Sequence, residues 1–143
     1  FDLPHFVLYN GKRCISYHNC IVSCDGELLF TIPNIEHFKF PDGVRIIANG
    51  SFCHNEVIQK LIIPNGVVSI EYGAFSCNQK LNAVYLPKTI KHIGSLRTYQ
   101  GRGRKYIEFF YPKEVHIPKG MKSTFKNMMP DIPESNLIDD ICY

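Results

Sequence analysis

Histidines and cysteines in the first third of the chain are the residues that could carry metal chemistry. Thiolate and imidazole groups are the usual tetrahedral ligands of zinc, and five residues invite that interpretation: His18, Cys20, Cys24, Cys53 and His54. They contain no paired C-x-x-C unit, and Cys53 and Cys77 occupy matching turns of a repeat, where a small buried thiol fits better. We therefore predict no metal, no cofactor, and mostly reduced thiols among the six cysteines.

No catalytic constellation stands out either. A cysteine nucleophile needs a histidine and an orienting group beside it, whereas the periodic positions of Cys53 and Cys77 indicate burial. There is no Ser-His-Asp order and no carboxylate pair. Residues 101–104, Gly-Arg-Gly-Arg, lack the lysine and the strand-to-helix context of a phosphate-binding loop. We predict that the chain is not an enzyme.

A basic cluster is the second feature with binding chemistry. The candidate basic loop comprises Arg97, Tyr99, Arg102, Arg104 and Lys105. Its aromatic residue could stack on a base while the arginines meet phosphate, but a solvated loop explains the same residues. The formal charge of +3 is otherwise spread along the chain, so nucleic acid is not favoured as a partner.

The elements that must position these residues follow from a repeat. A constant shift of about 23 residues along the sequence aligns apolar residues and prolines in columns. Phe38 aligns with Leu61 and Val84, Phe40 with Ile63 and Leu86, and Pro41 with Pro64 and Pro87. Such a period with apolar columns is typical of a leucine-rich solenoid, whose stacked coils bury one another. We predict an α/β or mainly β solenoid: a right-handed coil of about four repeats, each about 23 residues long, with short parallel strands on one face, few short helices and irregular caps.

Within each coil, side chains should alternate across a short strand that ends at the proline. In the second coil, Leu61 and Ile63 share the apolar columns, so Ile62 points to the opposite face. A turn and a second extended segment follow, here at residues 67–70. One phenylalanine per coil, such as Phe75, then fills the space between neighbouring coils.

The flanks are expected to cap a single domain of residues 1–143 whose repeats cover residues 35–118. Ile107 and Phe109 continue the period, which predicts a fourth strand after an irregular loop at residues 95–105. Residues 1–34 form an N-terminal cap or a degenerate repeat, because residues 23–27 fit a hairpin turn equally well. Apolar residues that would fit the repeat columns there are Ile15, Tyr17, Ile21, Cys24 and Leu29. Residues 119–143 form the C-terminal cap, with a short helix at residues 123–129.

The run LIIPNGVVSIEYGAFSC at residues 61–77 resembles the repeat of the BspA-like leucine-rich-repeat family. Residues 115–125 are similar to the closing segment that often follows the last such repeat, so the resemblance covers roughly residues 35–130. Departures are Ser51 before Phe52, and residues 96–104 in place of an alanine-phenylalanine turn. The resemblance implies a noncatalytic adhesion or recognition role at a cell surface or in a secreted, often bacterial, protein.

An outward column of the predicted sheet is the candidate binding face. It consists of Lys39, Ile62, Tyr85 and Glu108, flanked by His37 and Lys60. The strand face is the usual recognition surface of a solenoid, and an exposed tyrosine beside an isoleucine is a suitable anchor. The same column is also explained if Ile62 and Tyr85 only cover each other. We expect a protein or host-surface ligand.

The alternative from another class is a structural or self-associating accessory domain, in or outside the cell, that pairs with its own copy through a sheet edge or the strand face. No apolar run is long enough to span a membrane, which needs roughly 20 residues. No signal peptide is visible at residues 1–5 of this chain. The compartment therefore stays open, with a surface or secreted location favoured by the resemblance alone.

Overall fold

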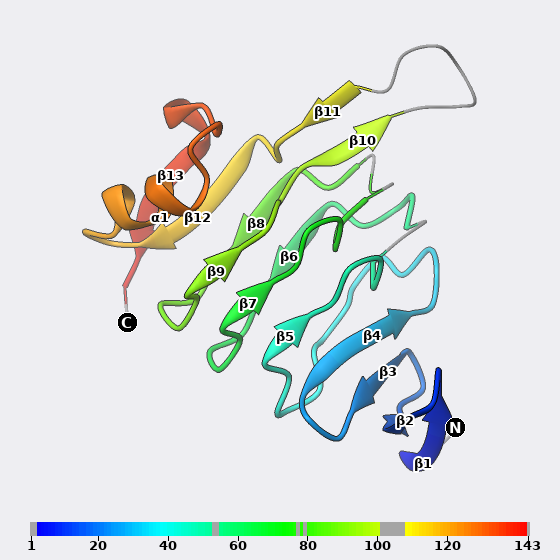
Figure 1. Cartoon of the computed structure of the whole chain (residues 1–143). Coiled ribbons are helices and arrows are strands. Elements are labelled where there is room, and N and C mark those ends of the chain that lie inside the picture. The colour runs from blue at the N-terminus through cyan, green and yellow to red at the C-terminus, as the bar shows by residue number, and fades with distance from the viewer. Residues whose placement is uncertain (1–2, 53–54, 77, 79, 101–107, 143) are drawn as a thin grey trace.

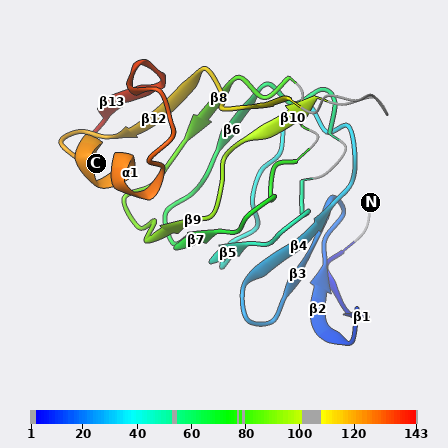
Figure 2. The ribbon, with the colours of Figure 1, turned by 45° about the horizontal axis from the view of Figure 1, so that its top comes forward.

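The computed structural model describes residues 3–52, 55–76, 78, 80–100 and 108–142. Two sheets of short strands lie on opposite sides of a solenoid, and the chain passes between them in successive coils (Figure 1). An antiparallel meander lies at one end of the stack, and a helix and a strand lie at the other (Figure 2). Among the residues described, no helix has the length and hydrophobicity needed to cross a membrane.

The first sheet has seven strands in the order β1-β2-β3-β4-β5-β7-β9. Its antiparallel part contains β1 (His5–Tyr9), β2 (Lys12–Ser16), β3 (Cys20–Ser23) and β4 (Glu27–Thr31). Its parallel part continues with β5 (Ile46–Ile47), β7 (Ser69–Ile70) and β9 (His92–Ile93). These last three are the second extended segments that the repeat predicts.

The second sheet is parallel, in the order β13-β12-β8-β6. Its strands are β6 (Lys60–Ile62), β8 (Ala83–Tyr85), β12 (Glu114–Pro118) and β13 (Leu137–Ile141). Outside both sheets, β10 (Thr98–Gln100) pairs antiparallel with β11 (Glu108–Phe110). The helical elements are α1 (Lys122–Met128) and a 3-10 turn, η1 (Glu134–Asn136).

Strand pairing confirms the period of the repeat. Lys60 pairs with Ala83 in one sheet, and Ile46 pairs with Ser69 in the other. Partners in neighbouring coils are thus separated by the same interval of about 23 residues in both sheets. The coils therefore stack in register, and each inward column of the sequence becomes a continuous row in space.

The core lies between the two sheets and contains the predicted columns. Leu61, Ile63, Val84 and Leu86 are at most 2% exposed, whereas Ile62 is 60% exposed. Phe52 and Phe75 are buried with their ring centroids 5.4 Å apart, so each ring packs on the ring of the next coil. The predicted alternation and the phenylalanine stack are both confirmed.

The N-terminal flank folds as hairpins, so the expected repeat columns there are wrong. Cys14, Cys20, Val22 and Leu28 are buried, whereas Ile15, Tyr17, Ile21 and Leu29 are only half-buried and Cys24 is exposed. The hairpin turn expected at residues 23–27 is present between β3 and β4. Because side chains alternate along a strand, a slip of one residue exchanges the inner and outer faces.

The strand that lies next to β8 in the parallel sheet is β12 and not the strand predicted at residues 107–109. A strand, β11, is present at Glu108–Phe110, but it pairs with β10. Val115 pairs with Val84, in the position that a constant period assigns to Ile107. The additional residues fall within the segment that contains β10 and β11, which pair with each other instead of joining the stack. The expected irregular loop is thus partly an ordered antiparallel pair. Leu96 and Thr98 in the same segment are fully buried.

The C-terminal flank covers the last coil. Helix α1 begins one residue before the predicted helix and buries Phe125, while Met129 and Ile132 are at most 2% exposed just beyond it. Strand β13 then pairs in parallel with β12 and buries Leu137. These apolar side chains join the core cluster that extends from Cys20 to Leu137.

Two asparagines stabilise the turns that lie between the sheets. Asn55 donates to the Ile35 carbonyl of the preceding coil at 2.9 Å, and its Oδ1 accepts the Ile58 N–H at 3.0 Å. One repeat later, the fully buried Asn78 donates to the Phe75 carbonyl at 2.9 Å and to that of Phe52. These side chains supply hydrogen bonds where the chain has no sheet ladder.

Replacing Asn78 with alanine is expected to lower the free energy of unfolding by about 2 kcal/mol, because buried carbonyls lose their donor. The measurement is urea unfolding followed by circular dichroism. Asn82→Ala is the matched control, since Asn82 is exposed and its backbone N–H makes the bond to Gln59. Equal losses in the two variants would show that the Asn78 side chain has no special role.

Candidate functional site

The outer surface of the second sheet carries a continuous set of polar and apolar side chains. Leu61, Val84 and Val115 point into the core and are at most 1% exposed, so their neighbours along each strand point outward. We define the strand face by these outward residues: Lys60 and Ile62 of β6, Ala83 and Tyr85 of β8, Glu114 and His116 of β12, and Ile138 and Asp140 of β13.

His116 lies at the centre of this face and is only 6% exposed. Its Nδ1 lies 2.9 Å from Oδ1 of Asp140, and its Nε2 lies 2.9 Å from Oε1 of Glu114. A carboxylate accepts hydrogen bonds and donates none, so both ring nitrogens must carry a proton to satisfy both partners. The arrangement therefore favours the imidazolium form of His116, between Glu114 of the same strand and Asp140 of the adjacent strand.

The charges around His116 explain the direction of its pKa. Burial lowers the pKa of the imidazole, but hydrogen bonds and charges from Asp140 and Glu114 outweigh burial and raise the pKa above its ordinary value. Both carboxylates are about half exposed, so solvent and salt weaken these ion pairs. Their effect is to fix the orientation of the ring more than to add stability.

Tyr85 is held between two basic side chains. The His116 ring stacks on it with centroids 4.1 Å apart and planes 4° from parallel. Lys60 places its Nζ 4.9 Å from the centroid of the same ring. Both contacts are favourable between a cation and an aromatic ring, so the row Lys60, Tyr85 and His116 is pre-organised across three strands.

Ile62 is the exposed apolar residue of the strand face. It lies opposite Tyr85 in the pairing of β6 and β8 and is 60% exposed, so Tyr85 does not cover it. A hollow of about 480 Å³ adjoins it, lined by Glu36, His37, Phe38, Gln59, Lys60 and Ile62. A partner could therefore place a side chain beside Ile62.

The structure places three of the predicted face residues, Lys39, His37 and Glu108, outside this sheet. Residues 38–40 form no strand, so Lys39 lies beside the first coil in a second hollow with Tyr17 and His18, and β6 is the first strand of the sheet. Phe38 and Phe40 pack their rings on Phe52 at 5.0 and 5.8 Å. We attribute the missing pairing to these rings, which occupy the inward positions that later coils give to smaller aliphatic residues.

Glu108 does not lie beside Tyr85 as predicted. It belongs to β11, where it pairs with Gln100, and His116 occupies the position next to Tyr85. Neither His116 nor Asp140 was a candidate from the sequence. His116 stands in the segment that resembles the closing part of the repeat array, which is the signal that could have placed it on the strand next to β8.

The candidate basic loop lies mostly outside the described residues, which include neither Arg102, Arg104 nor Lys105. Tyr99 belongs to β10. Arg97 lies near Tyr111: burial raises the pKa of this tyrosine, and the charge of Arg97 lowers it in part. Arg97 is thus placed near the segment that joins β11 to β12.

The candidate metal ligands are spread over the N-terminal end. Burial raises the pKa of the Cys20 thiol to about 12, while Cys24 lies exposed beyond the other end of β3. Cys53 and His54 lie outside the described residues, as does Cys77. Where the structure describes the chain, no three His, Cys, Asp or Glu side chains are grouped to hold a metal ion.

His116→Gln is expected to destabilise the protein more at low pH than at high pH. A raised pKa contributes stability that is complete below the ordinary value of about 6.5 and is lost as the pH rises through the pKa of the folded state. The difference in unfolding free energy between wild type and variant should therefore shrink as the pH rises through the pKa of His116 in the folded protein. His92→Gln, at an exposed histidine of β9, is the control, and a pH-independent difference for His116→Gln would contradict the cationic arrangement.

Comparison with known proteins agrees with the architecture. The family model described as the BspA type leucine-rich-repeat region matches residues 26–129 in six copies. No curated protein and no solved structure gives a significant match to the chain. The matched region includes β5 to β9, β12 and α1, and therefore all parallel strands of the solenoid except β13. Because the model of this family's repeat matches more than half of the chain, the chain belongs to the BspA-type leucine-rich-repeat family.

Proposed function

We propose that the strand face binds a protein partner, with Ile62 as its apolar anchor and the row Lys60, Tyr85 and His116 as its fixed polar part. Repeats of this family build protein-interaction modules, and folds of this kind are typically noncatalytic. The observation that carries the proposal is the stacked row itself, which crosses three strands. Side chains ordered before binding lose little conformational entropy when a partner arrives.

The charge pattern of the strand face indicates what the partner should offer. Lys60 and Ile62 lie together on β6 at one end of the face. The two half-exposed carboxylates, Glu114 of β12 and Asp140 of β13, lie toward the other end, where Ile138 pairs with His116. A complementary surface would bring an acidic group to Lys60, an apolar side chain to Ile62 and a basic group to Glu114 or Asp140. Such a pattern favours a folded protein surface over a polyanion.

The setting we propose is adhesion or recognition at a cell surface or in a secreted form. The support is the resemblance of the repeats to a family with such roles, together with a four-stranded sheet whose outer side carries the strand face. Compartment and partner are both part of the proposal.

Ile62→Asp is expected to weaken binding to the partner at least tenfold, which is the effect of losing one central anchor of an interface. The assay is biolayer interferometry of the purified chain against a panel of extracellular-matrix and cell-surface proteins. Tyr72→Asp is the matched control, because Tyr72 is 62% exposed and lies away from the strand face.

Two results would decide against the proposal. If no protein in the panel binds the wild-type chain, the adhesion role loses its support. If a bound protein tolerates Ile62→Asp as well as it tolerates Tyr72→Asp, the contact lies elsewhere on the solenoid.

A further inference from the structure

The outer edge of the first sheet is an unprotected strand. Among the residues that the structure describes, strand β1 pairs with β2 alone and forms the end of the sheet order. Proteins commonly protect such an edge with a lysine, a proline or a bulge, but β1 reads HFVLY and its pairing with β2 is regular. Phe6 is 81% exposed and Leu8 is 77% exposed.

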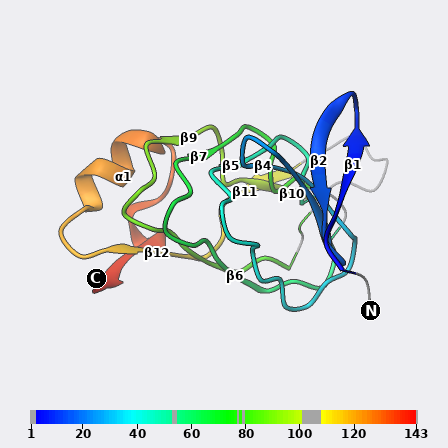
Figure 3. The same ribbon diagram turned by 90° about the horizontal axis from the view of Figure 1, so that it is seen from below.

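The apolar side of β1 continues the core side of the sheet. Phe6 lies opposite Ile15, Ile15 opposite Val22, and Val22 opposite Leu28. Along this row the side chains pass from buried Leu28 and Val22, through half-buried Ile15, to exposed Phe6. Figure 3 shows why: the β1–β2 hairpin stands out beyond the body of the solenoid.

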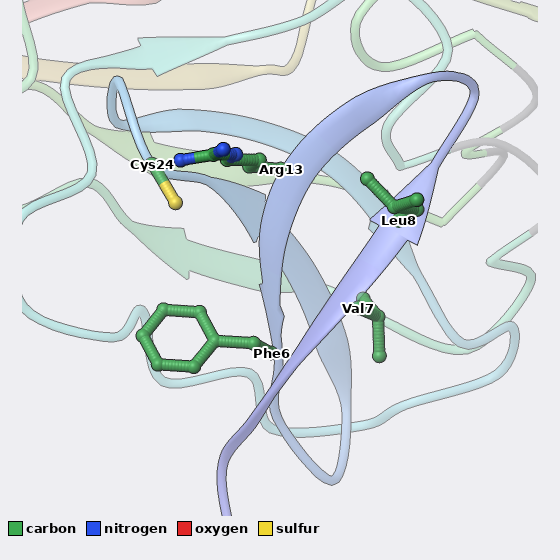
Figure 4. Close-up of a pocket in the computed structure, with 5 residues that line it drawn as sticks. All are labelled: Phe6, Val7, Leu8, Arg13 and Cys24. Carbon is green, nitrogen blue, oxygen red and sulfur yellow. The ribbon is translucent and has the colours of Figure 1, made fainter.

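A shallow apolar hollow lies on this hairpin. It measures about 450 Å³ and is lined by Phe6, Val7, Leu8, Arg13 and Cys24 (Figure 4). In Figure 4 the side chains of Phe6 and Arg13 extend in the same direction, toward Cys24. The edge of β1 therefore combines unpaired backbone with an adjoining apolar surface.

The backbone of β1 has a defined pattern of free hydrogen-bonding groups. The Arg13 carbonyl accepts the Cys24 N–H at 3.0 Å, so it points toward β3 and away from β1. Leu8 faces Arg13, and this pair is therefore of the type without mutual hydrogen bonds. The N–H and C=O groups of Leu8, and by the period of two those of Phe6, point to the open edge.

We propose that a second copy of this chain pairs with the open edge of β1 in antiparallel orientation, with Phe6 opposite Leu8 of the second copy and Val7 opposite its own copy at a two-fold axis. In this register the outward N–H and C=O groups of Phe6 in one copy bond to those of Leu8 in the other copy. The two-fold axis repeats the same pair of hydrogen bonds between Leu8 of the first copy and Phe6 of the second. Apolar side chains then oppose apolar side chains on the same face. Both copies use the same strand, as an isologous two-fold interface requires.

Charge does not oppose this pairing. Lys12 already forms an ion pair with Glu27 at 3.1 Å within its own chain. Arg13 lies on β2, so Arg13 and its copy are separated by three strand intervals of about 4.8 Å, or ~14 Å. That separation exceeds the screening length of about 8 Å at physiological salt.

The apolar area that β1 and its neighbours can bury limits the expected affinity of the dimer. Leu3, Phe6 and Leu8, the three most exposed large apolar residues of the hairpin region, offer on the order of 400 Å². A specific dimer of standard size buries about 800 Å² on each partner, so the backbone edge supplies much of the remainder. We expect a weak dimer with a dissociation constant in the micromolar range.

The test is sedimentation velocity of the purified chain over a concentration series. Wild type is expected to shift from 16.4 kDa toward twice that mass as concentration rises. Leu8→Pro removes one outward N–H without removing a β1–β2 hydrogen bond, and it should weaken the dimer at least tenfold. Leu8→Lys places a charge at the same point and should do the same.

Ile62→Lys is the control, because it adds the same charge to the strand face and should leave the dimer intact. Amide hydrogen exchange provides a direct readout, since the Phe6 and Leu8 amides should gain protection only at high concentration. A wild-type chain that stays at 16.4 kDa throughout the series overturns the proposal. A dimer that dissociates in Ile62→Lys but not in either Leu8 variant also overturns it, and that result would place the interface on the strand face.

Discussion

No single coil of this chain can bury its own apolar side chains, and the rest of the structure depends on that constraint. A coil contributes only a short strand to each sheet, so its inward aliphatic residues are covered by the coils before and after it. The equal length of successive coils is what brings Phe52 against Phe75 and Leu61 beside Val84. Polar groups between the coils also depend on the neighbouring coil, since the side chains of Asn55 and Asn78 each donate to a carbonyl of the preceding coil.

The repeating part of the fold could be predicted because each of its columns needs one kind of residue at one spacing. The fourth strand could not be predicted in that way. A constant period places each strand correctly only where no residues are inserted between coils. Between Ile93 and β12 the chain contains additional residues, which include the β10–β11 pair. Because β12 and not β11 lies next to β8, His116 stands beside Tyr85 where Glu108 was predicted, and this difference changes the chemistry of the strand face. Asn55 and Asn78 occupy matching positions of the repeat, but these positions are polar and are not found by aligning apolar residues.

The N-terminal part shows the limit of pattern arguments more sharply. In an antiparallel hairpin the turn sets the register, and Asn10 and Gly11 adopt the positive φ angles of a two-residue turn. That local choice puts Ile15 opposite Phe6 and Val22, and it turns Cys14 to the other side of β2, where it is buried. The columns of the solenoid contain no information about this register. Sequence reasoning therefore placed the solenoid correctly and its first sheet edge incorrectly.

The two ends of the solenoid consequently have different chemistry. At the C-terminal end, α1 covers the core, while the contact of His116 with Asp140 joins β12 to β13. At the N-terminal end, the first sheet continues outward to the open edge of β1. The strand face belongs to the other sheet, so pairing through β1 would leave both copies of that face uncovered. A dimer carries two strand faces. When one face has bound a surface with many copies of the partner, the second face binds at a higher effective concentration of partner. A weak edge contact and a pre-organised face are thus physically compatible, because each involves a different sheet.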